Sequence, residues 1–449
     1  MKTPQAHAPP PAPAPGAARR AALGGSFLSG AVGRLLPASV PFRYFGAAVV
    51  FHLAAWLVVL LSAADWPAWR GGLGWPLAAL HLVTLGTLAA SAIGASLQLL
   101  PVATRMPVRW PRLPALLWWI YVPGVVVLTA GMGLARPPWL ALGAAGVIAV
   151  LLGYGLLLAL NLRGARGMAG VVLHGWGALI ALALLLASAT ALVMLWLGRP
   201  LLDRDSARGL HLAAGVFGFM GLLALGLSSV LLPMFALGRV PDDRRQLAAG
   251  GAALTAVALA AAAALAPAVA MPLRVTALLC GAVGLVLHLR LMRGVLAGAM
   301  RPDLGWGGRL MHMGWAGLAL TLVLAAAALA ADAASPWARL FGLAAVGGWL
   351  TSFLFGVLQR ILPFLAAMHA AQGRRRAPTP SALTLGRALA WHAVAHALAL
   401  VLLAAGIAAS SALLVRAAGA TGTVGAAAFA VFLATLLQRL RRAMAAPAD

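Results

Sequence analysis

The sequence predicts an all-α membrane protein, a polytopic bundle of twelve transmembrane helices in three four-helix repeats with pseudo-threefold symmetry. Of its 449 residues, 63% are apolar and only 9% are charged, and the mean hydropathy is +0.96. A soluble chain carries about a quarter of its residues as charged side chains. The apolar residues also fall into blocks long enough to cross a hydrocarbon layer of ~30 Å as helices.

Twelve helices follow from the apolar blocks, and together they form one membrane domain over residues 41–440. The Pro/Ala-rich segment 1–40 cannot pack a core and is expected to be a disordered cytoplasmic tail. Residues 441–449 form a short second tail. The helices are expected at roughly 43–63, 74–101, 113–135, 138–160, 169–197, 208–237, 246–267, 271–297, 309–332, 337–369, 383–409 and 412–438.

The net charge of +25 indicates orientation rather than nucleic-acid binding, because the arginines alternate between loops. Short loops rich in Lys and Arg stay in the cytoplasm. Both termini and every second loop are arginine-rich, so both termini are expected inside. The lipid bilayer is then the main partner, and the bacterial cytoplasmic (inner) membrane is the expected location. The arginine-rich loops hold Arg105, Arg109 and Arg112; Arg163 and Arg166; Arg239, Arg244 and Arg245; Arg293, Arg301 and Arg309; and Arg374, Arg375 and Arg376.

A repeat links spans two, six and ten. Each contains two glycines eight residues apart and a proline seven residues later, and successive prolines are 132 and 130 residues apart. Small residues let helix backbones approach closely, so these glycines predict one packing seam per repeat. The three sets are Gly86, Gly94 and Pro101; Gly218, Gly226 and Pro233; and Gly348, Gly356 and Pro363.

Three four-helix arcs with both termini inside resemble subunit I of the heme-copper oxidases. They are also similar to its non-oxidase relatives, such as the NnrS family of heme- and copper-containing membrane proteins linked to nitric-oxide metabolism. The resemblance implies heme, and it admits copper as a second cofactor. It also implies a low-spin heme held between a His in span two and a His in span ten.

Histidines are the main titratable side chains within the spans, which contain no Asp, Glu or Lys. Buried ionisable residues in a membrane are costly and are usually functional. His81 matches the span-two heme ligand that the resemblance implies. Span ten has no His at depth, and span seven lacks the copper-binding pair, so oxygen reduction is not expected. The eight candidates are His52, His81, His174, His211, His288, His312, His392 and His396.

A heme is expected among spans one, two, eleven and twelve, which hold four of these histidines. At ~1.5 Å rise per residue, His81 lies roughly 20 Å and His396 roughly 18 Å from the inner boundary, a matching depth. His52 and His392 form the second pairing of similar depth. A hydrogen-bonded Trp/His packing layer is the alternative for all four residues.

A copper site is the second expectation, at the inner side. His174 lies in span five, and His312 lies between Met311 and Met313 in span nine. His and Met clusters suit copper. His211 and His288 are further candidate metal ligands.

The function expected is therefore a heme-binding membrane protein without oxygen-reducing activity. Its roles would lie in respiration or in nitric-oxide or metal stress, with other respiratory subunits as candidate partners. The alternatives are a twelve-span transporter of small molecules or metals and a purely structural membrane subunit. The four-helix repeat and the lack of buried carboxylates argue against the transporter.

Overall fold

A computed structural model describes residues 36–104, 106–165, 167–332, 335–371 and 378–445. Across these ranges the chain is helical, with loops between helices and no strand. Twelve helices are long and apolar enough to cross a membrane, which confirms the predicted fold class. The two tails predicted at 1–40 and 441–449 fall largely outside the described residues, as do Arg374, Arg375 and Arg376.

Eleven of the twelve spans begin and end within four residues of their predicted limits, and span twelve runs seven residues further than predicted, to Ala445. Nine consist mainly of one α-helix, while spans two, six and ten are each divided into three segments. The single-helix spans are α2 (Ser39–Leu61), α5 (Leu113–Gly133), α6 (Pro137–Arg163), α7 (Ala169–Trp196), α10 (Asp243–Leu265), α11 (Ala270–Ala297, after a short 3-10 turn η4, Pro267–Val269), α12 (Gly305–Ala330), α16 (Gly386–Ala408) and α17 (Ala412–Ala445).

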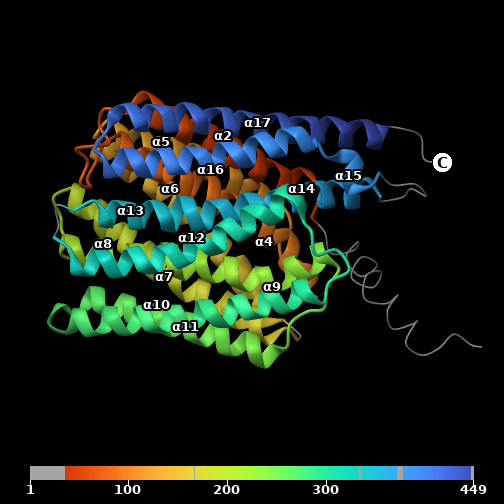
Figure 1. Ribbon diagram of the computed structural model, residues 1–449, viewed down its shortest axis with the longest axis horizontal. Helices are drawn as coiled ribbons and strands as arrows, with labels where there is room; N and C mark the ends of the chain where they lie inside the picture. Colours follow the sequence, from red (N-terminus) through yellow and green to blue (C-terminus); the bar gives the residue numbers. More distant parts are fainter. Residues whose placement is uncertain (1–35, 105, 166, 333–334, 372–377, 446–449) are drawn as a thin grey trace, which may run out of the picture.

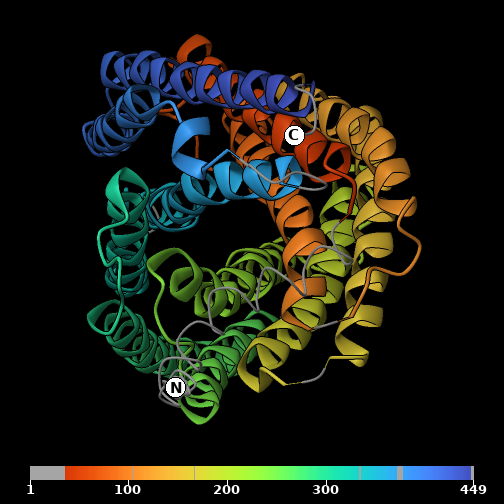
Figure 2. The same ribbon diagram turned by 90° about the vertical axis from the view of Figure 1, so that its right-hand side faces the viewer.

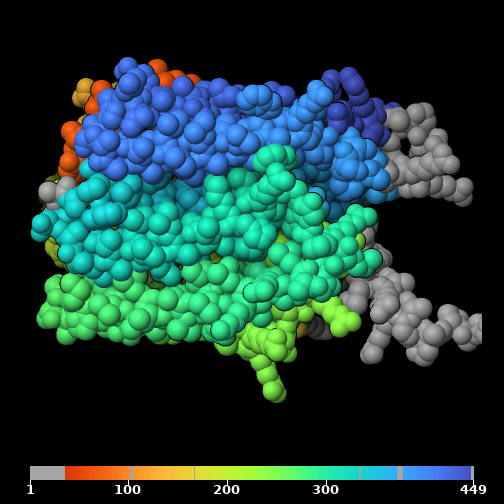
Figure 3. Space-filling view, viewed as in Figure 1, coloured from red at the N-terminus to blue at the C-terminus, as the bar shows by residue number. Residues whose placement is uncertain are grey.

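The helices lie side by side along the long axis of the molecule (Figure 1). Seen along that axis, the chain runs around the bundle from α2 through the middle helices to α16 and α17 (Figure 2). Helix α17 packs against α2, which closes the bundle. The space-filling view shows α17, α16, α12, α10 and α11 as parallel bands on one face (Figure 3). These outer bands are the apolar surface that a bilayer would cover.

A π-helical segment interrupts the same place in each repeat. Span two is α3 (Trp75–His81), η2 (Leu82–Ala89) and α4 (Ala90–Ala103). Span six is α8 (Arg204–Leu212), η3 (Ala213–Gly221) and α9 (Leu222–Ala236), and span ten is α13 (Trp337–Leu343), η5 (Ala344–Thr351) and α14 (Ser352–Ala370). The three π segments begin 131 residues apart, so the internal repeat extends to a rare backbone geometry.

Hydroxyl groups satisfy carbonyls in two of these π segments. The Oγ1 of Thr87 donates to the carbonyl of Leu82 at 3.2 Å, and that of Thr351 donates to Val346 at 2.7 Å. Both contacts reach five residues back, because the wider π turn places that carbonyl beside the side chain. π segments occur mostly as short interruptions of α-helices and are frequent at functional sites.

The repeat glycines lie at close helix contacts, as the repeat predicts. A Cβ on Gly356 would lie 2.7 Å from the carbonyl oxygen of Gly307 in α12, and one on Gly86 would lie 2.6 Å from Phe51 in α2. No side chain fits at these distances without moving a helix. Glycine at these positions therefore sets how closely the central spans pack.

Candidate functional site

Three buried histidines from two helices surround one aromatic ring. His52 comes from α2, and His392 and His396 lie one turn apart on α16. The ring centre of Phe355, from α14, lies 4.4 Å from His52, 4.5 Å from His392 and 6.1 Å from His396. We call His52, His392 and His396 the three-histidine cluster. Its members are 2%, 0% and 2% exposed, so the cluster is closed to solvent.

The ring centres within the cluster are spaced as for metal ligation. His52 lies 6.1 Å from His392 and 6.4 Å from His396, and the two α16 rings are 5.8 Å apart. Two imidazoles that share one ion have ring centres roughly 6 Å apart, from metal–nitrogen bonds of about 2 Å. The spacing of His52 from each α16 ring therefore fits an ion between them.

Ser352 determines the tautomer of His396. The Ser352 hydroxyl donates to the carbonyl of Gly347 at 2.9 Å, so its oxygen accepts from the Nε2–H of His396 at 3.0 Å. The Nδ1 of His396 then carries a lone pair in the neutral ring. This nitrogen is buried and has no hydrogen-bond partner in the described chain. It is free to act as a ligand.

The other two rings are also incompletely paired. The Nδ1 of His392 lies 3.3 Å from the amide nitrogen of Gln359, which also donates to the carbonyl of Leu389. Because this amide donates to Nδ1, the Nε2 of His392 carries the proton of the neutral ring. Within the described residues, neither this Nε2–H nor the Nδ1 of His52 has a partner. One nitrogen of every ring in the cluster is thus buried and unpaired.

A porphyrin does not fit between these rings as they are packed. Phe355 packs against the His52 and His392 rings, and Phe429 from α17 lies 4.8 Å from both Phe355 and His392. A ligand of this size needs a pocket of about 300 Å³ or more. Both phenylalanines would have to move before a heme could enter. A single ion needs far less space.

His81 does not join this cluster, although its depth along the bundle led us to expect it near His396. It is the last residue of α3, and its ring centre lies 6.3 Å from that of His211 in α8. Depth along the axis was a poor guide here, because lateral neighbours depend on how each helix is rotated. The structure therefore links His81 to span six rather than to spans one and eleven.

The remaining candidates lie apart from both groups. His288 is buried, with its Nε2 3.4 Å from the Ser228 hydroxyl and its ring 6.3 Å from Trp315. His312 is exposed, and its ring centre lies 5.1 Å from that of Trp315. His174 donates its Nδ1–H to the carbonyl of Gly170 at 2.7 Å. Each of the three thus has a hydrogen-bond or aromatic partner within the described residues.

No group of three or more His, Cys, Asp or Glu side chains within the described ranges is already arranged to hold a metal ion. The three-histidine cluster meets the spacing between pairs of rings but does not direct three nitrogens at one point. An ion there would take two ligands, the unpaired Nδ1 atoms of His52 and His396. His52 and His396 are the pair with the widest spacing.

Sequence reasoning missed the residues of span ten that complete the cluster. Span ten has no histidine at depth, yet it supplies Phe355, Ser352 and Gln359 to the cluster. The available signal was the presence of Ser352 and Gln359 in an apolar helix, seven residues apart on one face. Their polarity within a buried span could have indicated a polar partner on the neighbouring helix.

The fold has a counterpart among solved structures, whereas the sequence has none. No protein-family model matches the chain, and no curated protein matches it in sequence. It is similar to a chain from the cryo-EM structure of a heme-copper terminal oxidase dimer, with a TM-score of 0.60 and 13% identity over 92% of this chain and 85% of that one. At this identity the likeness establishes the fold alone. The protein is thus a multi-pass membrane protein with a heme-copper oxidase-like fold.

Proposed function

We propose that the protein is a membrane metalloprotein in which the three-histidine cluster binds a copper ion without reducing oxygen. The observation that supports this is the pair of buried, unpaired Nδ1 atoms on His52 and His396. An unsatisfied buried polar group costs several kcal/mol in a bilayer interior, where water is scarce. A bound ion would satisfy both atoms at once.

Copper suits the ligands better than other common metals. Neutral imidazole binds Fe, Cu, Ni and Zn, but structural zinc almost always takes four ligands in a tetrahedron. The cluster offers two unpaired Nδ1 atoms, on His52 and His396, which matches the low coordination number of cuprous ion. Ser352 would orient His396 from behind. A bound copper ion would supply one-electron redox chemistry, and His52 and His396 would hold it in a dry site.

Heme is the second candidate, and two observations favour it. The 6.4 Å between the ring centres of His52 and His396 also suits two axial ligands of one iron. The solved structure with the similar fold is described as a heme-copper terminal oxidase. The packing of Phe355 and Phe429 opposes heme, so we place copper first. His81, 6.3 Å from His211, is not part of either proposal for this cluster.

We further propose that the chain lies in a bacterial cytoplasmic membrane with both termini at the cytoplasmic side. Spans six and twelve both end at the same end of the bundle, since an even number of spans lies between these two points. That end carries Arg239, in the loop after α9, and Arg244 and Arg245, in the first turn of α10, in support of this orientation. We also propose that this metal centre acts in respiration or in the response to nitric-oxide or metal stress, and that other respiratory subunits are partners of the chain.

The experiment is a metal analysis of the full chain purified in detergent. Copper and iron per chain are measured together with the visible spectrum, for the wild type and for His396→Ala. His312→Ala is the matched control, because His312 is exposed and lies on α12, outside the cluster. Copper lost in His396→Ala but kept in His312→Ala supports the proposal. Copper content equal in all three proteins would refute it, and a Soret band lost only in His396→Ala would favour heme.

A further inference from the structure

A second pair of histidines joins two repeats near the end of the bundle opposite the C-terminus. His81 lies six residues after the start of α3, and His211 lies seven residues after the start of α8. At ~1.5 Å per residue, both lie roughly 10 Å from that end. Both side chains are half-buried, unlike the three-histidine cluster. Each also lies within two residues of the start of a π segment.

The two rings are spaced as two ligands of one ion would be. Their centres are 6.3 Å apart and their planes differ by 29°. Two imidazoles on a common ion have centres roughly 6 Å apart, given metal–nitrogen bonds of about 2 Å.

Hydrogen bonds leave the same nitrogen available on both rings. The Nδ1 of His81 lies 3.0 Å from the carbonyl oxygen of Leu77, which can only accept, so Nδ1 carries the proton. The Ser188 hydroxyl donates to the carbonyl of Leu185 at 2.9 Å, so its oxygen accepts weakly from the Nδ1–H of His211 at 3.5 Å. Both Nε2 atoms then hold lone pairs. A backbone carbonyl or hydroxyl behind a histidine is the usual support of a metal-bound imidazole.

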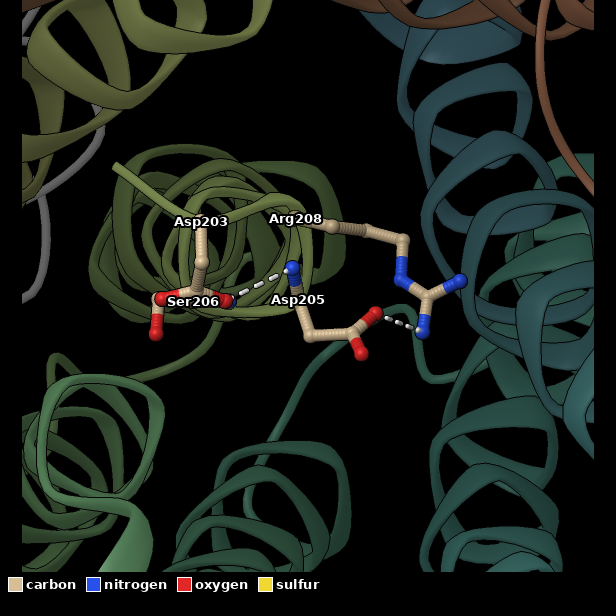
Figure 4. A network of polar contacts seen from close by, with 4 residues as sticks. All are labelled: Asp203, Asp205, Ser206 and Arg208. Atoms are coloured by element: carbon tan, nitrogen blue, oxygen red, sulfur yellow. Dashed lines mark hydrogen bonds and ion pairs between the residues drawn. The ribbon is translucent and has the colours of Figure 1, made fainter. Parts of the chain in front are cut away.

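The carboxylates of the same helix end are occupied elsewhere. Asp203 accepts from the backbone N–H groups of Asp205 and Ser206, and Asp205 pairs with Arg208 at 3.1 Å (Figure 4). Hydrogen bonds from Ser206 lower the pKa of Asp203, which keeps this carboxylate ionised in its capping role. Because Asp203 and Asp205 stabilise the start of α8, they are not available as metal ligands. An ion bound at His81 and His211 would therefore have these two ligands alone.

We propose that His81 and His211 bind one cuprous ion as a two-coordinate site that exchanges with the aqueous phase at this end of the bundle. Two neutral imidazoles on opposite sides of an ion suit cuprous copper, whereas zinc would require two further ligands. Because the side chains are half-buried and close to the end of the bundle, the ion could enter without crossing the core. This site does not depend on the three-histidine cluster.

The test is a titration of the purified full chain with cuprous ion in competition with bicinchoninate. His81→Ala and His211→Ala should each lose one tightly bound ion or weaken it at least about tenfold. The double variant should lose no more than either single one. His312→Ala is the matched control, since its Nδ1 also bonds a carbonyl one turn back, at 2.8 Å. Equal binding in all variants would overturn the proposal.

A second measurement covers the case in which a variant fails to fold. Diethyl pyrocarbonate labels exposed imidazoles, and mass spectrometry reads each site in the unmutated protein. Cuprous ion should protect both His81 and His211 from labelling by diethyl pyrocarbonate at the same ion concentration, while His312 should still be labelled. Protection of neither residue, or of only one, would contradict a shared ion. If His81→Ala loses the ion of the His81–His211 pair but keeps the ion bound at His396, this proposal is supported independently of the proposal for the three-histidine cluster.

Discussion

The Nε2 of His396 lies 3.0 Å from the hydroxyl oxygen of Ser352, and this contact fixes which nitrogen of the imidazole is free. The Ser352 hydroxyl donates its hydrogen bond to the carbonyl of Gly347, so its oxygen accepts the hydrogen bond from the imidazole N–H. The free Nδ1 is buried in the three-histidine cluster. Ser352 in span ten thus fixes the tautomer of His396 in span eleven and leaves its Nδ1 lone pair available to a metal ion.

Replacing Ser352 with Ala should weaken metal binding at the cluster by roughly 10- to 100-fold, as expected for the loss of a group that orients a ligand. The affinity is measured by competition titration with a copper chelator. Ser228→Ala is the matched control, because Ser228 contacts His288 in the same way, at 3.4 Å, outside the cluster. Equal affinity in Ser352→Ala and the wild type would show that Ser352 does not orient His396.

Phe355→Ala should destabilise the protein by about 3 to 5 kcal/mol, because it removes a fully buried ring that contacts all three histidines. The measurement is thermal unfolding in detergent, followed by loss of the helical signal. Phe341→Ala serves as the control, since Phe341 is half-buried in α13 and should cost much less. Similar unfolding temperatures for the two variants would mean that the cluster is loosely packed.

A double substitution tests heme against copper. If heme is excluded by the packing of Phe355 and Phe429, then Phe355→Ala/Phe429→Ala incubated with hemin should gain a Soret band that the wild type lacks. His396→Ala in that background should remove the band. A Soret band of equal strength in the wild type would show instead that the two rings move aside without mutation.

Gly356→Ala should prevent normal packing of α14 against α12, because the new Cβ would lie 2.7 Å from a backbone oxygen of Gly307. A backbone atom cannot move aside as the end of a flexible side chain can. We therefore expect the free energy of unfolding to fall by about 1 to 3 kcal/mol or more. Gly342→Ala is the control in the same span, where nothing lies within 4 Å of an added Cβ. The yield of monodisperse protein and its unfolding temperature distinguish the two variants. A stable Gly356→Ala protein would contradict the tight contact.

Oxygen consumption by the purified protein should be zero with any electron donor. Span ten supplies Phe355, Ser352 and Gln359 to the cluster, where the oxidase resemblance would require histidine ligands. An oxygen electrode measures the rate after contaminating oxidases have been removed. Turnover that tracks the purified chain and disappears in His392→Ala would show that the cluster reduces oxygen.

The sequence predicted the spans and their repeat well, because hydropathy and glycine spacing are properties of single helices. It did not predict the π segments, which no residue pattern around Leu82, Ala213 or Ala344 indicated. It also failed to pair His81 with His211. Depth along a helix can be counted from the sequence, but the direction in which a side chain points depends on packing between spans.

The copper content of the purified chain, after reconstitution with cuprous ion and removal of the excess, shows whether the three-histidine cluster binds copper. We expect two ions per chain in the wild type and one in a variant lacking His52, His392 and His396. The ion that remains should be lost when His81 is also replaced. A variant without the three-histidine cluster that still binds as much copper as the wild type would show that the cluster binds none.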